Sequence, residues 1–143
     1  MSRSAALLAE PAALSLPLVM PVYRPGTRDA RRLLYDDAMV IIEREYPSDL
    51  RLDGVAARIF TSRRSLQRAF NDAGRSFRGE HLRARLRAAA AAMRADPQRT
   101  VRDVSLAVGY RQPAQFAKAF RREFGVSPAA YREAAATARR REH

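Results

Sequence analysis

A pattern that occurs twice along the chain limits the possible folds more than any other feature. Each copy has a short segment with an apolar face, a tight turn and a longer amphipathic segment, all at helical spacing. The apolar positions of the first copy are Val55, Ala56, Ile59, Leu66 and Phe70. The matching positions of the second copy are Val104, Ser105, Val108, Phe116 and Phe120, with the small Ser105 where the first copy has Ala56. The pattern predicts two helix-turn-helix units, a geometry in which the second helix enters a major groove of DNA.

The segment between the two copies has a strong helix signal. Ser76 is suited to cap its start, 88–92 is a run of alanines, and Asp96-Pro97 ends it. A helix over 77–95 would be about 30 Å long. Two recognition helices joined in this way can meet successive major grooves, since one turn of DNA spans about 34–36 Å. We therefore expect one chain to bind an asymmetric site.

The predicted fold is all-α, with about seven helices that form two helix-turn-helix subdomains bridged by the long linker helix. A first helix is expected at 29–46, and a last short helix is expected to open at Ser127-Pro128 and run through Tyr131 into the basic tail. The predicted divisions are an apolar, Pro-rich arm at 1–30, a first subdomain at 31–75, the linker helix at 76–96, a second subdomain at 97–133 and a basic tail at 134–143.

The charge balance favours a polyanionic partner. Lys and Arg number 27 against 15 Asp and Glu, a net charge of +12, which attracts nucleic acid at neutral pH. The absence of cysteine excludes disulfides, thiolate metal sites and cysteine nucleophiles. The two histidines, His81 and His143, are far apart, and no acidic cluster or Gly-rich phosphate loop occurs. We expect no cofactor, no metal and no catalysed reaction.

The amino-terminal arm carries leucines but reads as neither a membrane span nor a secretory signal. Prolines at 11, 17, 21 and 25 break its apolar stretch. We expect a cytoplasmic location and no membrane partner. The apolar residues of the arm have two readings: they pack on the domain, or they dock on a partner chain.

Several motifs resemble the DNA-binding domain of the AraC/XylS family of bacterial transcription regulators. Residues 62–70 resemble its first recognition helix, and 101–110 resemble the start of its second unit. Residues 116–132, with Gly125-Val126-Ser127-Pro128 and Tyr131-Arg132, resemble its C-terminal signature, which is highly specific. The resemblance extends from about Arg31 to Arg132. It implies sequence-specific binding of duplex DNA, contact with RNA polymerase and, as the family's commoner mode, activation of transcription.

The resemblance also implies which residues meet DNA. The candidate DNA-binding residues of the first unit are Ser62, Arg63, Arg64, Gln67 and Arg68. Those of the second unit are Arg111, Gln112, Pro113, Ala114, Gln115 and Lys118. Arg can bridge guanine O6 and N7, and Gln can bridge adenine N6 and N7. In the second recognition helix only Gln115 and Lys118 can hydrogen-bond to bases, so we expect the first unit to discriminate more sharply. The alternative is that the arginines contact phosphates alone.

Two features depart from the family pattern. Phe60 lies in the first turn, where a small residue, often glycine, is usual; a positive φ there would strain phenylalanine. An amino-terminal ligand-binding domain is also missing, so the chain is either a stand-alone regulator or a fragment of a longer one. The rival functions are an architectural DNA-binding protein without sequence preference and a basic module that docks on an acidic protein. RNA binding is less favoured because exposed aromatics for base stacking are not evident.

Overall fold

The computed structural model describes residues 27–143, so the predictions for the arm at 1–26 lie outside the described residues. Seven helices and no strand occur in the described part, which confirms the all-α prediction. They are α2 (Arg28–Glu45), α3 (Leu52–Arg58), α4 (Arg63–Asp72), α5 (Phe77–Ala95), α6 (Val101–Ala107), α7 (Pro113–Phe124) and α8 (Pro128–Glu142).

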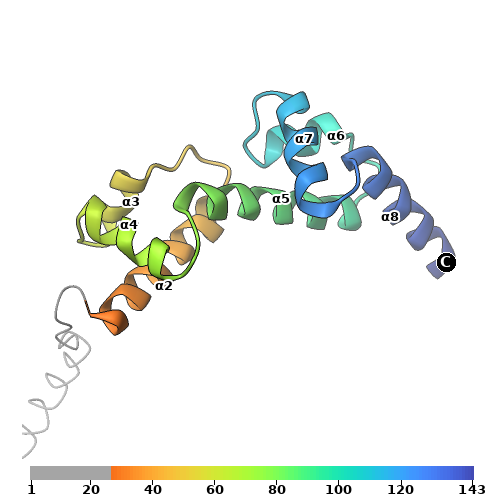
Figure 1. Cartoon of the computed structure of the whole chain (residues 1–143). Coiled ribbons are helices and arrows are strands. Elements are labelled where there is room, and N and C mark those ends of the chain that lie inside the picture. The colour runs from red at the N-terminus through yellow and green to blue at the C-terminus, as the bar shows by residue number, and fades with distance from the viewer. Residues whose placement is uncertain (1–26) are drawn as a thin grey trace, which may run out of the picture.

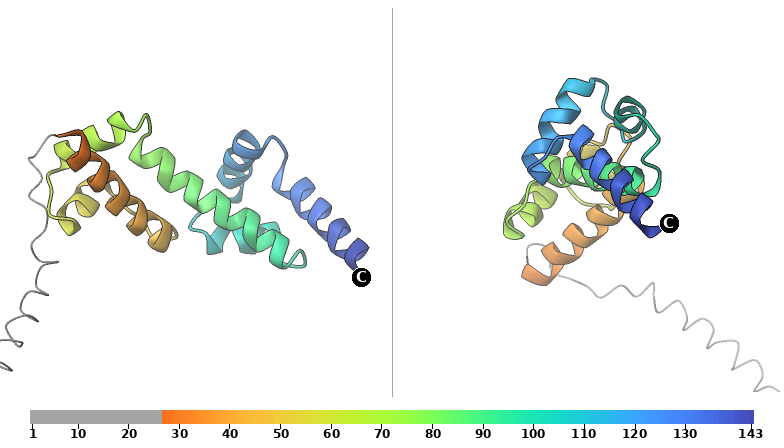
Figure 2. Two further views of the ribbon diagram at one scale, coloured as in Figure 1. Left: turned by 90° about the horizontal axis from the view of Figure 1, so that it is seen from below. Right: turned by 90° about the vertical axis from the view of Figure 1, so that its right-hand side faces the viewer.

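Helix α5 joins two units that each have a separate core. Helices α2 to α4 pack at its amino-terminal half and α6 to α8 at its carboxyl-terminal half (Figures 1 and 2). The first core centres on Ile42, Leu66 and Phe70, all fully buried. The second core centres on Met93, Phe116 and Phe120, which are equally buried. The 19 residues of α5 span about 28 Å, so the length expected from the sequence holds.

Side-chain caps fix where most of the helices begin. The hydroxyl oxygens of Ser62, Ser76 and Thr100 each accept a hydrogen bond from the backbone N–H three residues later, at 3.0 Å. These bonds satisfy N–H groups that have no partner within the helix. The predicted cap of α5 by Ser76 is therefore confirmed, and α4 and α6 are capped in the same way.

The last helix is much longer than the sequence pattern predicted. We expected a short helix that ended near Tyr131, but α8 continues to Glu142, so the predicted tail is mostly helical. The Tyr131 ring packs 5.4 Å from that of Phe120, and Arg132 Nε donates to the Pro97 carbonyl at 2.8 Å. Arg139 donates to carbonyls at the end of α5, where helices carry unpaired acceptors. The apolar pattern fades after Tyr131, but these contacts and the alanines continue the helix.

The turn of the first unit has the strain that the sequence suggested. Phe60 adopts φ 57°, the only positive φ at a non-glycine residue in the described chain. Its side chain is 96% exposed, so no packing offsets the strain. In the second unit, Gly109 has φ 107° at the equivalent point, where glycine adopts this backbone freely. The two turns therefore both require a positive φ, which is adopted by phenylalanine in the first and by glycine in the second.

Residues 27–143 contain neither a candidate membrane-spanning helix nor a candidate metal site. No helix there combines the length and apolar character needed to cross a membrane. No group of three or more His, Cys, Asp or Glu residues gathers there in a way that could hold a metal ion.

Candidate nucleic-acid interface

Helix α4 presents one apolar and one polar face. Leu66, Ala69 and Phe70 are buried in the first core. Arg63, Arg64 and Arg68 lie on the exposed face, whereas Gln67 is half-buried. The Gln67 amide nitrogen donates weakly to Asn71 Oδ1, at 3.4 Å. Because the apolar face is held against α2 and α3, the basic face has a fixed outward direction.

Helix α7 has the same organisation with a different start. Phe116 and Phe120 are buried, and Ala114, Gln115 and Lys118 are exposed. Gln112 is the N-cap residue but makes no capping bond through its side chain, and Pro113 occupies the first turn. Pro at this position costs nothing, since its missing N–H would have no helical partner. The polar end of the Gln112 side chain therefore remains available to a ligand.

The basic residues on these faces have no internal partner. Within residues 27–143, the side chains without an ion pair or a hydrogen bond include those of Arg63, Arg64, Arg68, Arg111 and Lys118. Elsewhere, arginines are held by acids: Arg58 binds Glu45 through two nitrogens, at 2.8 and 2.6 Å. Unpaired cations can meet phosphates without first giving up an intramolecular partner.

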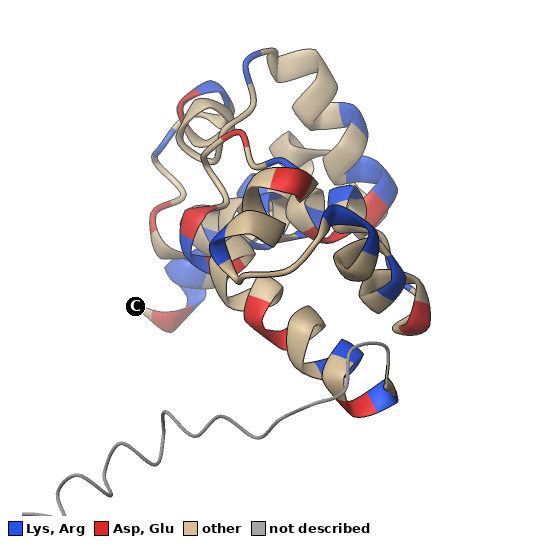
Figure 3. Cartoon of the chain, turned by 90° about the vertical axis from the view of Figure 1, so that its left-hand side faces the viewer, with Lys and Arg blue, Asp and Glu red and all other residues tan. Residues whose placement is uncertain are grey.

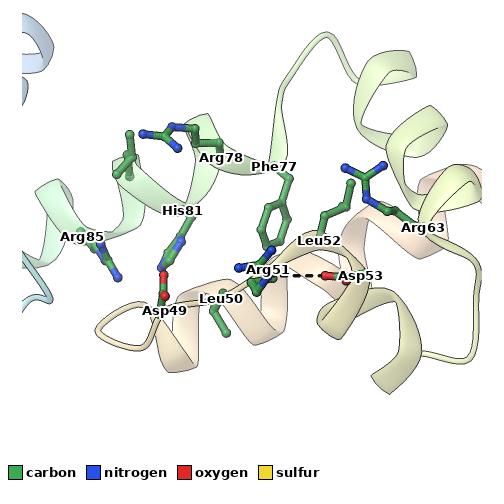
Figure 4. Close-up of a pocket in the computed structure, with 11 residues that line it drawn as sticks. Asp49, Leu50, Arg51, Leu52, Asp53, Arg63, Phe77, Arg78, His81 and Arg85 are labelled. Atoms are coloured by element: carbon green, nitrogen blue, oxygen red, sulfur yellow. Dashed lines mark ion pairs between the residues drawn. The ribbon is translucent and has the colours of Figure 1, made fainter.

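Two adjoining hollows lie along α5 between the recognition helices. The first lies between the α2–α3 connection, α4 and the first half of α5; Arg63 reaches it from α4, and Arg78 lies beside it on α5 (Figure 4). The second is lined by Arg111 and Gln115 at the start of α7. Asp49, Arg78, Leu82 and Arg85 line both hollows. The starts of α4 and α7 therefore face one continuous side of the molecule.

The structure brings together some of the candidate residues and leaves others apart. Arg63 lines the first hollow, and Arg111 and Gln115 line the second. The remaining candidates lie outside the two hollows, on or beside the faces of α4 and α7; they are Ser62, Arg64, Gln67, Arg68, Gln112, Pro113, Ala114 and Lys118. Sequence reasoning missed Arg78, although a basic residue two places after the Ser76 cap must lie in the first turn of α5. It also missed Arg51, which is 3.9 Å from Asp53.

Positive charge extends over both units. Figure 3, which views the molecule from one end, shows many Lys and Arg residues with Asp and Glu residues among them. Burial lowers the pKa of His81 in the first hollow, and the nearby Arg85 lowers it further, although a bond to the Tyr46 carbonyl works in the opposite direction. The positive charge that faces a ligand in the hollows comes from arginine, and the carboxylate of Asp49 lies among these arginines.

Comparisons with known proteins agree with this arrangement. The sequence pattern of a helix-turn-helix domain family matches residues 55–134. The right origin-binding protein of Escherichia coli K12 is 34% identical over 97 residues, which are 67% of this chain and 33% of that protein. The regulatory protein SoxS of Salmonella typhimurium is 32% identical over 91 residues, 64% of this chain and 85% of that protein.

A solved structure matches the fold and also contains DNA. The DNA-binding domain of AdpA, a global transcriptional factor crystallised with a target DNA, superimposes with a TM-score of 0.64. It is 30% identical, and the match covers 77% of this chain and 97% of that domain. The chain spans about a third of the length of the right origin-binding protein.

Proposed function

The chain belongs to the AraC family of helix-turn-helix transcription regulators, and from this we propose that it binds duplex DNA sequence-specifically and regulates transcription. The observation that carries the proposal is the pair of uncovered recognition faces, on α4 and α7, in the two units that one 19-residue helix joins. A nonspecific binder needs basic charge but does not need two such outward helices. The proposed action is binding, with no reaction catalysed.

The proposed mechanism divides the candidate residues by the part of DNA they meet. Arg64, Gln67 and Arg68 on α4, and Gln115 and Lys118 on α7, meet base edges in successive major grooves. Ser62, Arg63, Arg111 and Gln112 meet phosphates beside the starts of the two helices. Pro113 and Ala114 carry no side-chain donor, so they make at most apolar contacts with thymine methyl groups. The first unit therefore contributes more discrimination than the second.

Selection from a randomised duplex library, at low and at near-physiological salt, tests this function. We expect an asymmetric site with two conserved blocks about one DNA turn apart, of which the first-unit block is the sharper. Arg64→Ala and Gln67→Ala should each lose about 1–3 kcal/mol of preference at one base pair. Arg141→Ala is the matched control, since it removes a cation at the exposed end of α8, far from both recognition helices.

The other outcomes of the selection distinguish the rival functions. A single conserved block would mean that one unit only holds the backbone. Equal enrichment of all sequences, with binding that disappears as salt rises, would overturn the regulator proposal in favour of an architectural DNA-binding protein. The net charge of +12 is the observation that favours this second candidate.

We propose activation as the regulatory outcome, through a contact with RNA polymerase. The support is the family alone, since regulators of this type act next to promoters in the cytoplasm. Transcription in vitro from a promoter that carries the selected site upstream should increase when the chain is added. A decrease would identify a repressor, and the DNA-binding function would stand.

A further inference from the structure

One arginine connects the two helix-turn-helix units directly. Arg85 lies near the middle of α5, and its Nε donates to the carbonyl oxygen of Tyr46, at 2.7 Å. A terminal nitrogen of the same guanidinium donates to the carbonyl of Ser48, at 2.9 Å. Both acceptors belong to the connection between α2 and α3 in the first unit. Arg85 therefore ties this connection to the linker helix by two bonds in a fixed fork geometry.

The same guanidinium also contacts the second unit. Its Cζ lies 5.7 Å from the centre of the Tyr110 ring, within the range of a cation–π interaction. Tyr110 is buried, and it follows the turn of the second helix-turn-helix unit. One side chain thus holds a backbone segment of the first unit and an aromatic ring of the second.

The backbones of the two units also approach each other at this point. Gly109 has φ 107°, and a Cβ placed on it would lie 2.7 Å from the Pro47 carbonyl oxygen and 2.8 Å from Arg85 Nε. No larger residue fits without displacing one of these atoms. Tyr46, next to Pro47, packs against both hydrophobic cores. The contact is therefore close, partly apolar and dependent on glycine.

We propose that Arg85 is a positioning residue that fixes the orientation of the two units and thereby sets the spacing between DNA blocks that the chain accepts. The other links between the units are Tyr46, which packs against both cores, the close approach of Gly109 to Pro47, and an ion pair of Arg83 with Glu123 of α7 at 3.6 Å. Arg85 opposes rocking of the units about α5 because it is bonded to one unit and stacked on the other. The consequence for spacing rests on the proposed function, whereas the orientation itself can be tested without DNA.

The spacing consequence follows from the geometry of the duplex. One added base pair moves the second block by about 3.4 Å and rotates it by about 34–36°. A rigid pair of recognition helices cannot follow that rotation without losing contacts at one block. A pair that rocks freely can follow it in part. The loss of affinity on changing the spacing between the DNA blocks therefore measures how rigidly the two units are oriented.

The first experiment measures the orientation in the free protein. The chain has no cysteine, so Asn71→Cys and Arg122→Cys provide one exposed spin-label site on α4 and one on α7. Pulsed electron paramagnetic resonance then gives the distribution of distances between the labels. We expect a narrow distribution that becomes about twofold broader in Arg85→Ala. Arg85→Lys, which keeps the charge but loses the fork, should be intermediate.

The matched control is Arg132→Ala. Arg132 Nε also donates to a backbone carbonyl, that of Pro97 at 2.8 Å, but both groups belong to the second half of the molecule. Its loss should lower stability and leave the distance distribution narrow. A distribution that broadens as much in Arg132→Ala as in Arg85→Ala would reflect general loosening and would overturn the proposal.

The second experiment measures binding to the selected site with zero, one or two base pairs inserted between its blocks. One inserted base pair should weaken wild-type binding about tenfold or more and Arg85→Ala binding about threefold or less. An unchanged distance distribution and an unchanged insertion penalty in the Ala and Lys variants would overturn the role of Arg85. If the wild-type chain selects no two-block site, the proposed function fails, and the distance measurement alone decides on the orientation.

Discussion

Gly109 meets the carbonyl oxygen of Pro47 so closely that a Cβ on the glycine would lie 2.7 Å from it. The two residues belong to different helix-turn-helix units, and the nearer atom is backbone, which cannot rotate away as a side chain can. Glycine is required here both for its φ of 107° and for its lack of a side chain. A substitution at Gly109 therefore has two energetic costs, the unfavourable φ and the steric overlap, and comparison with another glycine can separate them.

Gly109→Ala should lower the free energy of unfolding by about 3 kcal/mol, since it adds a steric overlap to an unfavourable φ. Gly74→Ala is the matched control, because Gly74 has φ 70° but nothing within 4 Å of the added Cβ. That variant should lose only about 1 kcal/mol. Urea denaturation measures both, and equal losses would show that the approach to Pro47 has no energetic weight.

Phe60→Gly should raise the stability by about 1 kcal/mol. The present residue adopts φ 57° with a side chain that is 96% exposed, so the substitution relieves strain and removes almost no packing. Phe60→Ala keeps the positive φ and should change the free energy of unfolding by less than about 0.5 kcal/mol. Thermal and urea denaturation of the two variants separate strain from contact. A destabilised Phe60→Gly would mean that the ring has a partner in the folded protein.

Stability should decrease as the pH falls from 7.5 to 5.5. Burial lowers the pKa of His81 in the folded state, whereas in the unfolded chain the group takes up a proton near pH 6.5. The unfolded state then binds more protons than the folded state, so the free energy of unfolding drops as the pH passes below this value. Of the charged groups that act on this pKa, Arg85 lowers it and Asp49 raises it.

The test of this pH dependence is His81→Gln, whose amide nitrogen can still donate to the Tyr46 carbonyl as His81 Nε2 does. Its urea midpoints should be nearly the same at pH 5.5 and 7.5. His143→Gln, at the exposed end of the chain, should keep the wild-type dependence. The explanation fails if the His81 variant loses stability with pH as steeply as the wild type.

Arg78→Ala should weaken binding to every duplex by a similar factor. Arg78 borders both hollows between the recognition helices, where the sugar-phosphate backbone would cross. A phosphate contact carries no sequence information, so the slope of log K against log salt should decrease in magnitude by about 0.9. Gln67→Ala should instead weaken only the selected site and keep the slope. A sequence-dependent loss in Arg78→Ala would assign the residue to base reading.

The sequence predicted the elements of this fold well because their signals are local. Ser62, Ser76 and Thr100 cap helices whatever surrounds them, and the spacing of Phe116 and Phe120 indicates a buried stripe without knowledge of its partner. The end of α8 was not predictable in this way. It depends on Arg139, which reaches residues 44 and 45 positions earlier in the chain.

The candidate interface, too, was predictable only where its signals are local. The exposed faces of α4 and α7 follow from helical periodicity, which separates Leu66 from Arg64 on sequence evidence alone. The contact between the two units cannot be predicted from periodicity, because Arg85 donates to the carbonyls of Tyr46 and Ser48, which lie 39 and 37 positions earlier in the chain. Nothing local in an arginine within an alanine-rich helix indicates that it will bond to main-chain oxygens. Side chains that connect units require the tertiary structure.

The two recognition faces of this chain differ in composition, with three arginines on α4 and one lysine on α7. In a symmetric dimer every substitution is made twice, so both half-sites must drift together. Under the proposed function, a mutation in α7 alters one half of the target and leaves the other half as an anchor. Promoters can therefore be gained or lost stepwise during evolution, with one block under constraint while the other is free to vary.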